Sequence, residues 1–180
     1  MTVKYKIKML SDWHCGSGLD SGADADLLVI KDENNLPYIP GKTIKGLLRD
    51  ALLDMLDVGK VEQSALDTLF GKVNEDKSTS PGKSSFYNAE LPAVEKNEIV
   101  MNSLSTHLYR NVASTSIDEK GVANQGSLRT MEVCIPMTLE GEIECPVDQK
   151  DILEKAMKWV RHLGSSRNRG LGRCQWTITA

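Results

Sequence analysis

The sequence lacks any apolar run close to the roughly 20 residues that a membrane-spanning helix needs, so we expect no membrane partner. It also lacks a CxxC pair, because its four cysteines (positions 15, 134, 145 and 174) lie far apart. A structural zinc site is therefore not expected, and free thiols in a reducing cytoplasm are the better interpretation. The N-terminal segment MTVKYKIKML alternates lysine with apolar residues, which does not fit a signal peptide.

A glycine is missing where a nucleotide-binding loop would need one. PGKT at residues 40–43 resembles the end of a P-loop, but the pattern GxxxxGK[ST] requires glycine at the position of Leu36. Without that glycine the loop cannot present successive N–H groups to a triphosphate, so we do not expect a nucleotide triphosphatase. A helix N-terminus flanked by Lys42 and Lys45 can still bind a backbone phosphate.

The composition is that of a single globular domain over residues 1–180. Apolar residues make up 40% of the chain and charged residues 26%, and the length is sufficient to bury one core. The formal net charge of −3 argues mildly against bulk nucleic-acid binding. A basic stripe can nevertheless lie on an acidic body, so the placement of the charges matters more than their sum.

Hydrophobic periodicity predicts alternating helices and strands. Apolar residues recur with helical spacing over residues 44–55 and 152–163, with Gly164 as the end of the second helix, and a shorter helix is expected at 64–70. Residues 94–128 show neither period and are interpreted as an irregular insertion that includes a hairpin. Strands are expected at residues 3–9, 27–30, 84–91, 131–145 and 175–179.

With the loops set aside, the order is strand, helix, strand, strand, helix, strand. This order predicts an α+β fold with a ferredoxin-like (RRM-like) βαββαβ core, inserted loops and a projecting hairpin. Such a sheet leaves one face free for a ligand. We detect no internal repeat and no second domain.

The segment GSSRNRGLGRC at residues 164–174 combines three glycines with three arginines and no acid. Glycine allows close approach of a backbone, and arginine pairs with phosphate in a fork geometry. The segment could also be only a helix cap followed by a tight turn. As a binding loop it predicts a phosphate-bearing partner, either a nucleotide or a polymer.

Three aspartates and two histidines are further candidates. Asp20, Asp24 and Asp26 follow a glycine-rich stretch, and nearby carboxylates can bind Mg²⁺ or accept a proton, although loop acids are often merely solvated. His14 and His107 are expected to be exposed. An imidazole at His14 could stack on a base or act as an acid or base.

Together these segments resemble the RAMP superfamily of CRISPR-associated proteins, most of all the repeated backbone subunit of type III effector complexes. The resemblance is carried by WHCGSG, DLLVIKDENNLPYIPGKTIKGLLRDAL, LFG and GSSRNRGLGRC, and it covers roughly residues 3–71 and 126–178. The segment RNVASTSIDEKGVANQGSL is similar to the projecting hairpin, or thumb, of that family, which we place at about 94–128.

The resemblance implies a subunit that binds CRISPR guide RNA through phosphate and sugar and leaves the bases free to pair with a complementary target RNA. It implies further copies of the chain and other RAMP subunits as partners in a cytoplasmic complex. The residues it implies in RNA binding are His14, Gly16, Gly18, Lys42, Lys45, Arg49, Arg110, Arg167, Arg169, Gly170 and Gly172.

The resemblance also implies metal-dependent cleavage of the target RNA. An aspartate just before the VIKD segment is essential in the target-cleaving relatives, and the matching residue is Asp26, with Asp24 and Asp20 as rivals. This acid would position Mg²⁺ or Mn²⁺, or help deprotonate the 2′-hydroxyl that attacks the adjacent phosphate. The alternatives are a catalytically inactive scaffold of the same complex, a metal-independent guide-processing ribonuclease using His14, and a binder of small phosphate compounds.

Overall fold

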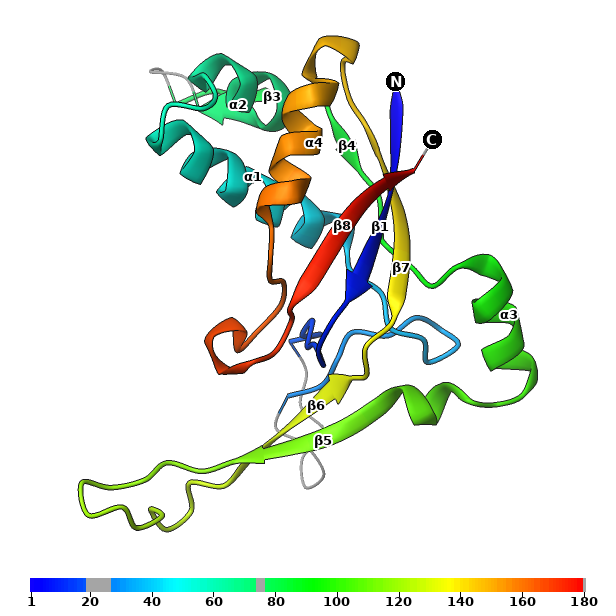
Figure 1. The fold of residues 1–180 in the computed structure, drawn as a ribbon, viewed down its shortest axis with the longest axis vertical. Coiled ribbons are helices and arrows are strands. Elements are labelled where there is room, and N and C mark those ends of the chain that lie inside the picture. The colour runs from blue at the N-terminus through cyan, green and yellow to red at the C-terminus, as the bar shows by residue number, and fades with distance from the viewer. Residues whose placement is uncertain (19–26, 74–76, 180) are drawn as a thin grey trace.

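The computed structural model describes residues 1–18, 27–73 and 77–179, and its centre is a four-stranded antiparallel sheet with the order β4-β7-β1-β8 (Figure 1). Two pairs of strands, β2 with β3 and β5 with β6, form separate two-stranded sheets. The strands are β1 (Thr2–Met9), β2 (Gly71–Val73), β3 (Thr79–Pro81), β4 (Ser85–Phe86), β5 (Tyr109–Ser114), β6 (Arg129–Cys134), β7 (Thr138–Glu144) and β8 (Cys174–Thr179).

Helices α1 and α4 cover one face of the central sheet (Figure 1). In the chain, α1 comes between β1 and β4, and α4 comes between β7 and β8. The elements β1, α1, β4, β7, α4 and β8 therefore form the expected βαββαβ core. The α+β, ferredoxin-like prediction is confirmed. The helices are α1 (Gly41–Asp57), α2 (Gln63–Phe70), α3 (Ala93–Met101) and α4 (Lys150–Trp159), with short 3₁₀ turns at Ser105–Leu108, Val147–Gln149 and Arg167–Arg169.

The alternation of β1 fixes which face of the sheet is buried. Tyr5 and Ile7 are almost completely buried, whereas Lys4 and Lys6 between and beside them are exposed. On the helical side, the apolar stripe of α1, which runs from Ile44 to Met55, packs against this buried face. One hydrophobic core therefore lies between the central sheet and the two helices.

The second long helix is shorter than its hydrophobic periodicity predicts. α4 ends at Trp159, and Val160 is already extended, so Gly164 does not end it. Residues 161–163 pair instead with the segment before β8: Leu163 N donates to Gly172 O at 2.9 Å, and Cys174 N donates to Arg161 O at 2.9 Å. Leu163 remains buried in this extended conformation, which is why its apolar character imitates a helical position.

The expected strand at 131–145 is two strands. Pro136 has no N–H to donate, and the ladder breaks around it, so β6 ends at Cys134 and β7 begins at Thr138. Residues 27–30 form only isolated bridges, at Leu27 and Val29, rather than a continuous strand.

The interval 94–128, expected to be irregular, contains helix α3. Hydrophobic periodicity does not predict this helix, because none of its residues is buried and no apolar stripe marks it. Lys96 holds the helix to the body through Asp32 at 3.1 Å and Glu90 at 3.2 Å. After α3 the chain forms the β5–β6 hairpin, which projects away from the central sheet (Figure 1).

Within the described ranges, no helix combines the length and the apolar character that crossing a membrane would require. All four cysteines are buried free thiols, as the sequence predicts. Burial raises the pKa of the Cys174 thiol to about 11, which keeps it protonated at neutral pH.

Candidate functional site

The glycine-rich segment 164–173 lies directly on the segment that follows β1. Ser165 N donates to His14 O at 2.9 Å, and Gly172 N donates to Asp12 O at 2.7 Å. In return, Leu10 N donates to Arg173 O at 2.8 Å. Both ends of the segment are thereby fixed, and its middle, which includes the 3₁₀ turn Arg167–Arg169, projects from the body (Figure 1).

Two of its glycines are required for this packing. Gly164 has φ +81°, and a Cβ atom there would overlap the carbonyl oxygen of His14. Gly172 has φ +73°, and a Cβ atom there would overlap the carbonyl oxygen of Leu163. Gly170, by contrast, is exposed, with open space where its Cβ would be. Gly172, expected to contact RNA, is therefore a buried packing residue, whereas Gly170 lies at the surface.

His14 is buried rather than exposed, which corrects the expectation from the sequence. Only 2% of the residue is accessible, and its Nδ1 lies 2.7 Å from the carbonyl oxygen of Glu132 on β6. Because a carbonyl can only accept, Nδ1 carries the proton in this bond. The imidazole thus connects the loop after β1 to the hairpin. His107, the other candidate, is exposed at the base of the hairpin.

Glu132 connects segments that lie far apart in the chain, a role that the sequence did not indicate. Its carboxylate accepts from Val29 N at 3.0 Å and from Lys31 Nζ at 2.7 Å, while its carbonyl accepts from His14. Lys31 Nζ also lies 4.1 Å from the ring centroid of Tyr109 on β5. One glutamate therefore joins three separate segments, and no short sequence motif marks such a role.

Arg110, expected to contact RNA, forms an ion pair with Asp12. The Asp12 side chain is only 8% exposed, whereas that of Arg110 is 62% exposed. The pair connects β5 to the segment after β1, next to the His14–Glu132 bond. The guanidinium of Arg110 thus has a structural partner and still presents a surface to solvent.

The cations of α1 form one exposed stripe. Lys42, Lys45 and Arg49 follow each other at intervals of three and four residues and are all exposed. The start of the stripe lies beside the loop after β1, because Lys42 and Thr43 both act on Cys15 in that loop. Burial raises the pKa of the Cys15 thiol, whereas a hydrogen bond with Thr43 and the positive charge of Lys42 lower it.

The first N–H of α1 is not available to a phosphate. Gly41 N donates to Asn88 Oδ1 at 2.9 Å, and a Cβ atom on Gly41 would overlap the backbone of Phe86. The helix start is packed against the strand region that follows β4. Any phosphate binding by this helix therefore depends on the side chains of its stripe.

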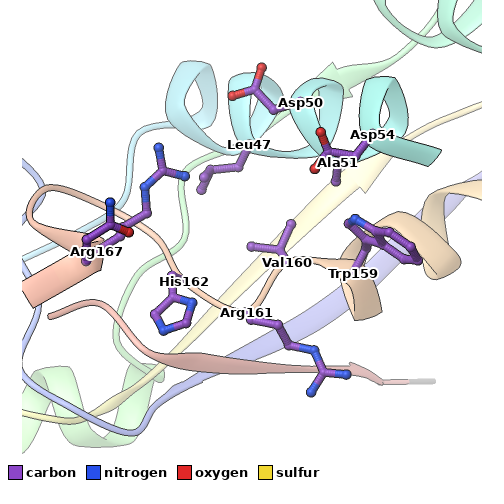
Figure 2. A pocket seen from close by; sticks show the side chains of 10 residues that line it. Leu47, Asp50, Ala51, Asp54, Trp159, Val160, Arg161, His162 and Arg167 are labelled. Atoms are coloured by element: carbon purple, nitrogen blue, oxygen red, sulfur yellow. The ribbon is translucent and has the colours of Figure 1, made fainter. Parts of the chain in front are cut away.

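A cavity of about 300 Å³ separates the middle of α1 from the residues that follow α4 (Figure 2). Arg167 reaches from the glycine-rich segment toward α1 (Figure 2). On the side of the cavity that α1 forms, the lining includes Leu47 and the acids Asp50 and Asp54. On its other side, the glycine-rich segment approaches the hairpin, where Arg169 shares a second cavity with residues of β5 and β6. The segment thus lies between the helix and the hairpin and contacts both cavities.

The free face of the sheet does not offer the same positive charge. Lys4 lies opposite Glu142, and Lys6 lies opposite Glu140 with an ion pair of 2.7 Å. Because cross-strand partners project from the same face, the glutamates of β7 offset the lysines of β1. One face of the sheet is free of helices, as expected, but its positive charge is offset, whereas the cations of α1 and of the glycine-rich segment are not paired with a described carboxylate.

The three candidate catalytic acids, Asp20, Asp24 and Asp26, lie outside the described residues. The chain re-enters the described part at Leu27, which pairs with Met131 of β6. In the ranges 1–18, 27–73 and 77–179, no group of three ligating side chains could hold a metal ion. Of the flanking glycines, Gly16 pairs with Val29, and Gly18 is exposed.

Comparison with known proteins gives a family and a fold. A search of curated proteins found no match. Among solved structures, a chain of the type III-B Cmr-beta bound to cognate target RNA has a TM-score of 0.75 at 12% identity, covering 99% of this chain and 97% of that one. A chain of the apo Cmr-beta has a TM-score of 0.72 at 13% identity, with the same coverage. The family model of the RAMP superfamily matches residues 6–175, so the chain belongs to the RAMP superfamily.

Proposed function

We propose that this chain is the guide-RNA-binding backbone subunit of a type III CRISPR effector complex and that it cleaves complementary target RNA. One observation carries the proposal. Every arginine except Arg110 lacks a carboxylate partner among the residues that the structure describes, although the protein is acidic overall. Arginines left unpaired beside a lysine stripe on α1 are suited to a polyanion.

The guide RNA lies along α1 and the glycine-rich segment. Lys42, Lys45 and Arg49 contact its phosphates from the helix, and Arg167 and Arg169 contact them from the segment. Such contacts read the backbone, so the bases stay free to pair with a target. A single copy makes few contacts, and adjacent copies in a cytoplasmic complex with other RAMP subunits extend the groove along the guide.

Cleavage is assigned to the segment between Gly18 and Leu27, with Asp26 as the first candidate and Asp24 and Asp20 as rivals. The acid helps to remove the proton of the target's 2′-hydroxyl, whose oxygen attacks the adjacent phosphate. The bond from phosphorus to the 5′-oxygen of the next nucleotide breaks, so the products are a 2′,3′-cyclic phosphate end and a protonated 5′-hydroxyl end. A Mg²⁺ or Mn²⁺ ion held by this acid would stabilise the negative charge that develops on the phosphate. The second candidate is a scaffold of the same complex that binds guide RNA and does not cut.

The guide-processing alternative is disfavoured by the environment of His14. A general base must come within hydrogen-bond reach of the proton that it removes. The His14 ring is buried, and its Nδ1 is bonded to the backbone of Glu132. Its part in RNA binding is therefore to position the glycine-rich segment, whose Ser165 N binds its carbonyl oxygen.

The experiment uses the chain assembled with its partner subunits and guide RNA. Labelled complementary RNA and Mg²⁺ are added, and cut products are compared for the wild type, Asp26→Ala, Asp24→Ala, Asp20→Ala and the control Asp57→Ala at the end of α1. We expect regularly spaced products that vanish in Asp26→Ala with target binding unchanged. Undiminished cutting in all three candidate variants would assign the chemistry to another subunit and leave this chain as the scaffold. Absence of guide RNA from the purified complex would overturn the proposal itself.

A further inference from the structure

A cavity of about 200 Å³, open to solvent, lies at the junction between the hairpin and the glycine-rich segment. Its walls come from the end of β5, the start of β6 and the 3₁₀ turn of the glycine-rich segment. No carboxylate takes part in the lining. The lining residues are Ser114, Thr115, Ser116, Ser127, Arg129 and Arg169.

Two of the residues that line the cavity are arginines without an ion-pair partner among the described residues. Neither Arg129 nor Arg169 forms an ion pair with any described residue, whereas Arg110, on the same hairpin, is paired with Asp12. Each guanidinium presents five N–H donors in a planar fork that matches the oxygens of a phosphate. Two exposed arginines beside one small cavity favour the binding of an anion there.

The hydroxyl groups of the cavity are held in place by the hairpin itself. Thr115 Oγ1 and Ser127 Oγ lie 2.6 Å apart, and Ser127 Oγ donates to Asn124 O at 2.7 Å. Ser116 N in turn donates to Ser127 Oγ at 3.2 Å. The start of the hairpin loop is therefore an ordered frame of short polar side chains beside the two arginines.

We propose that this cavity binds one phosphate group, gripped by Arg129 from the hairpin and by Arg169 from the glycine-rich segment. Its size suits the ligand: a water molecule takes about 30 Å³ of liquid, so a phosphate and some of its hydration fit within the cavity. The chemistry requires only a phosphate monoanion or dianion. That the phosphate belongs to an RNA backbone rests on the proposed function.

The position of the cavity gives the bound phosphate a second effect. The contacts that fix the hairpin to the body involve Arg110, Glu132 and Cys134, near the base of the ladder. Ser114 and Arg129 form the last pair of that ladder, farther from the body. A phosphate bound by both Arg129 and Arg169 therefore connects the hairpin to the body at this outer point. Among the described residues, no ion pair makes that connection.

The first test needs no RNA. Arginine side-chain Nε–Hε resonances of the full chain are followed while inorganic phosphate is added, in the wild type, Arg129→Gln and Arg169→Gln. We expect the Arg129 and Arg169 signals to shift with one shared dissociation constant, and each shift to fall at least fivefold when the other arginine is replaced. Arg110, which is already paired with Asp12, is the internal control. A shift of Arg169 that is unchanged in Arg129→Gln would overturn the shared site.

The second test identifies the source of the phosphate. Binding of labelled single-stranded RNA is measured against salt concentration for the wild type, both single variants and the double variant. Each contact with a single-strand phosphate contributes about 0.7 to the slope of log K against log salt. If both arginines bind one phosphate, the slope should fall by the same amount in both single variants and in the double variant. A fall in the double variant equal to the sum of the two single falls would overturn the shared site. A wild type that binds phosphate at this site but no RNA would refute the RNA source and the proposed function, and the phosphate site would stand.

Discussion

Gly164 is in backbone contact with His14: a side chain on this glycine would overlap the carbonyl oxygen of His14, which already accepts a hydrogen bond from Ser165 N. This contact shows that the glycines and the arginines of the glycine-rich segment have different roles. Gly164 and Gly172 are there for packing against the body, while the arginines between them face outward. The close approach that the glycines permit is to the protein's own backbone.

Replacing Gly164 by alanine should therefore destabilise the fold more than the same change at Gly170. Both residues have positive φ, near +81° and +84°, so the cost of the left-handed conformation, about 1–2 kcal/mol, is common to both. Only Gly164 also suffers overlap, and we expect a total loss of about 2–4 kcal/mol there. Urea unfolding measures both variants, and equal losses would show that the backbone contact is not tight.

The Asp12–Arg110 pair should hold the hairpin to the body. Arg110→Gln leaves the buried Asp12 carboxylate without its cation, and we expect a loss of about 1–3 kcal/mol in the free energy of unfolding. Asp12→Asn should cost less, because the exposed Arg110 is then simply solvated. The double variant should resemble Asp12→Asn, which gives a positive coupling energy in a double-mutant cycle. Additive losses would mean that the two side chains act independently.

Asp32 should make stability depend on pH at the acid end. Burial opposes its ionisation, but hydrogen bonds from Leu36 N and Lys96, with a further one from Asn34 N, outweigh burial and lower the pKa of the carboxyl. The pKa of Asp32 in the folded protein lies below the unfolded value of about 3.9. At pH values between these two, the carboxyl is therefore protonated more often in the unfolded chain than in the folded one. The stabilisation is therefore present above about pH 4 and is lost as the pH falls through the folded pKa.

Asp32→Asn keeps the Oδ1 acceptor for both N–H groups and removes only the charge beside Lys96. Wild type and variant should differ in unfolding free energy at pH 6 and converge toward pH 2. Glu33→Gln, at an exposed neighbouring position, is the control. A difference that persisted unchanged at pH 2 would assign the effect to packing.

The stripe on α1 should contribute to RNA affinity through charge alone. Lys45→Gln and Arg49→Gln should each weaken binding of single-stranded RNA and lower the slope of log K against log salt by about 0.7. Lys6→Gln is the matched control, because Lys6 is also exposed to solvent but is paired with Glu140. Fluorescence anisotropy at several salt concentrations gives both quantities. An equal effect of Lys6→Gln would mean that the chain binds RNA by net charge and has no defined groove.

Much of the architecture follows from local patterns in the sequence. The alternation in β1 and the apolar stripe of α1 are visible there, because each repeats at the period of its own backbone. The family resemblance likewise depends on short segments near both ends of the chain. The exposed position of Lys42, Lys45 and Arg49 also follows from the sequence, since they lie opposite the apolar stripe.

Only the tertiary structure decided which side chains meet. His14 is buried because Glu132, far away in the chain, supplies a carbonyl for it, and α4 ends early because residues 161–163 pair with the segment before β8. Arg129 and Arg169 share a cavity although forty residues separate them. Periodicity records only neighbours within a turn or a strand, whereas these contacts form between segments that the fold brings together, so the sequence determines the elements and the packing determines the site.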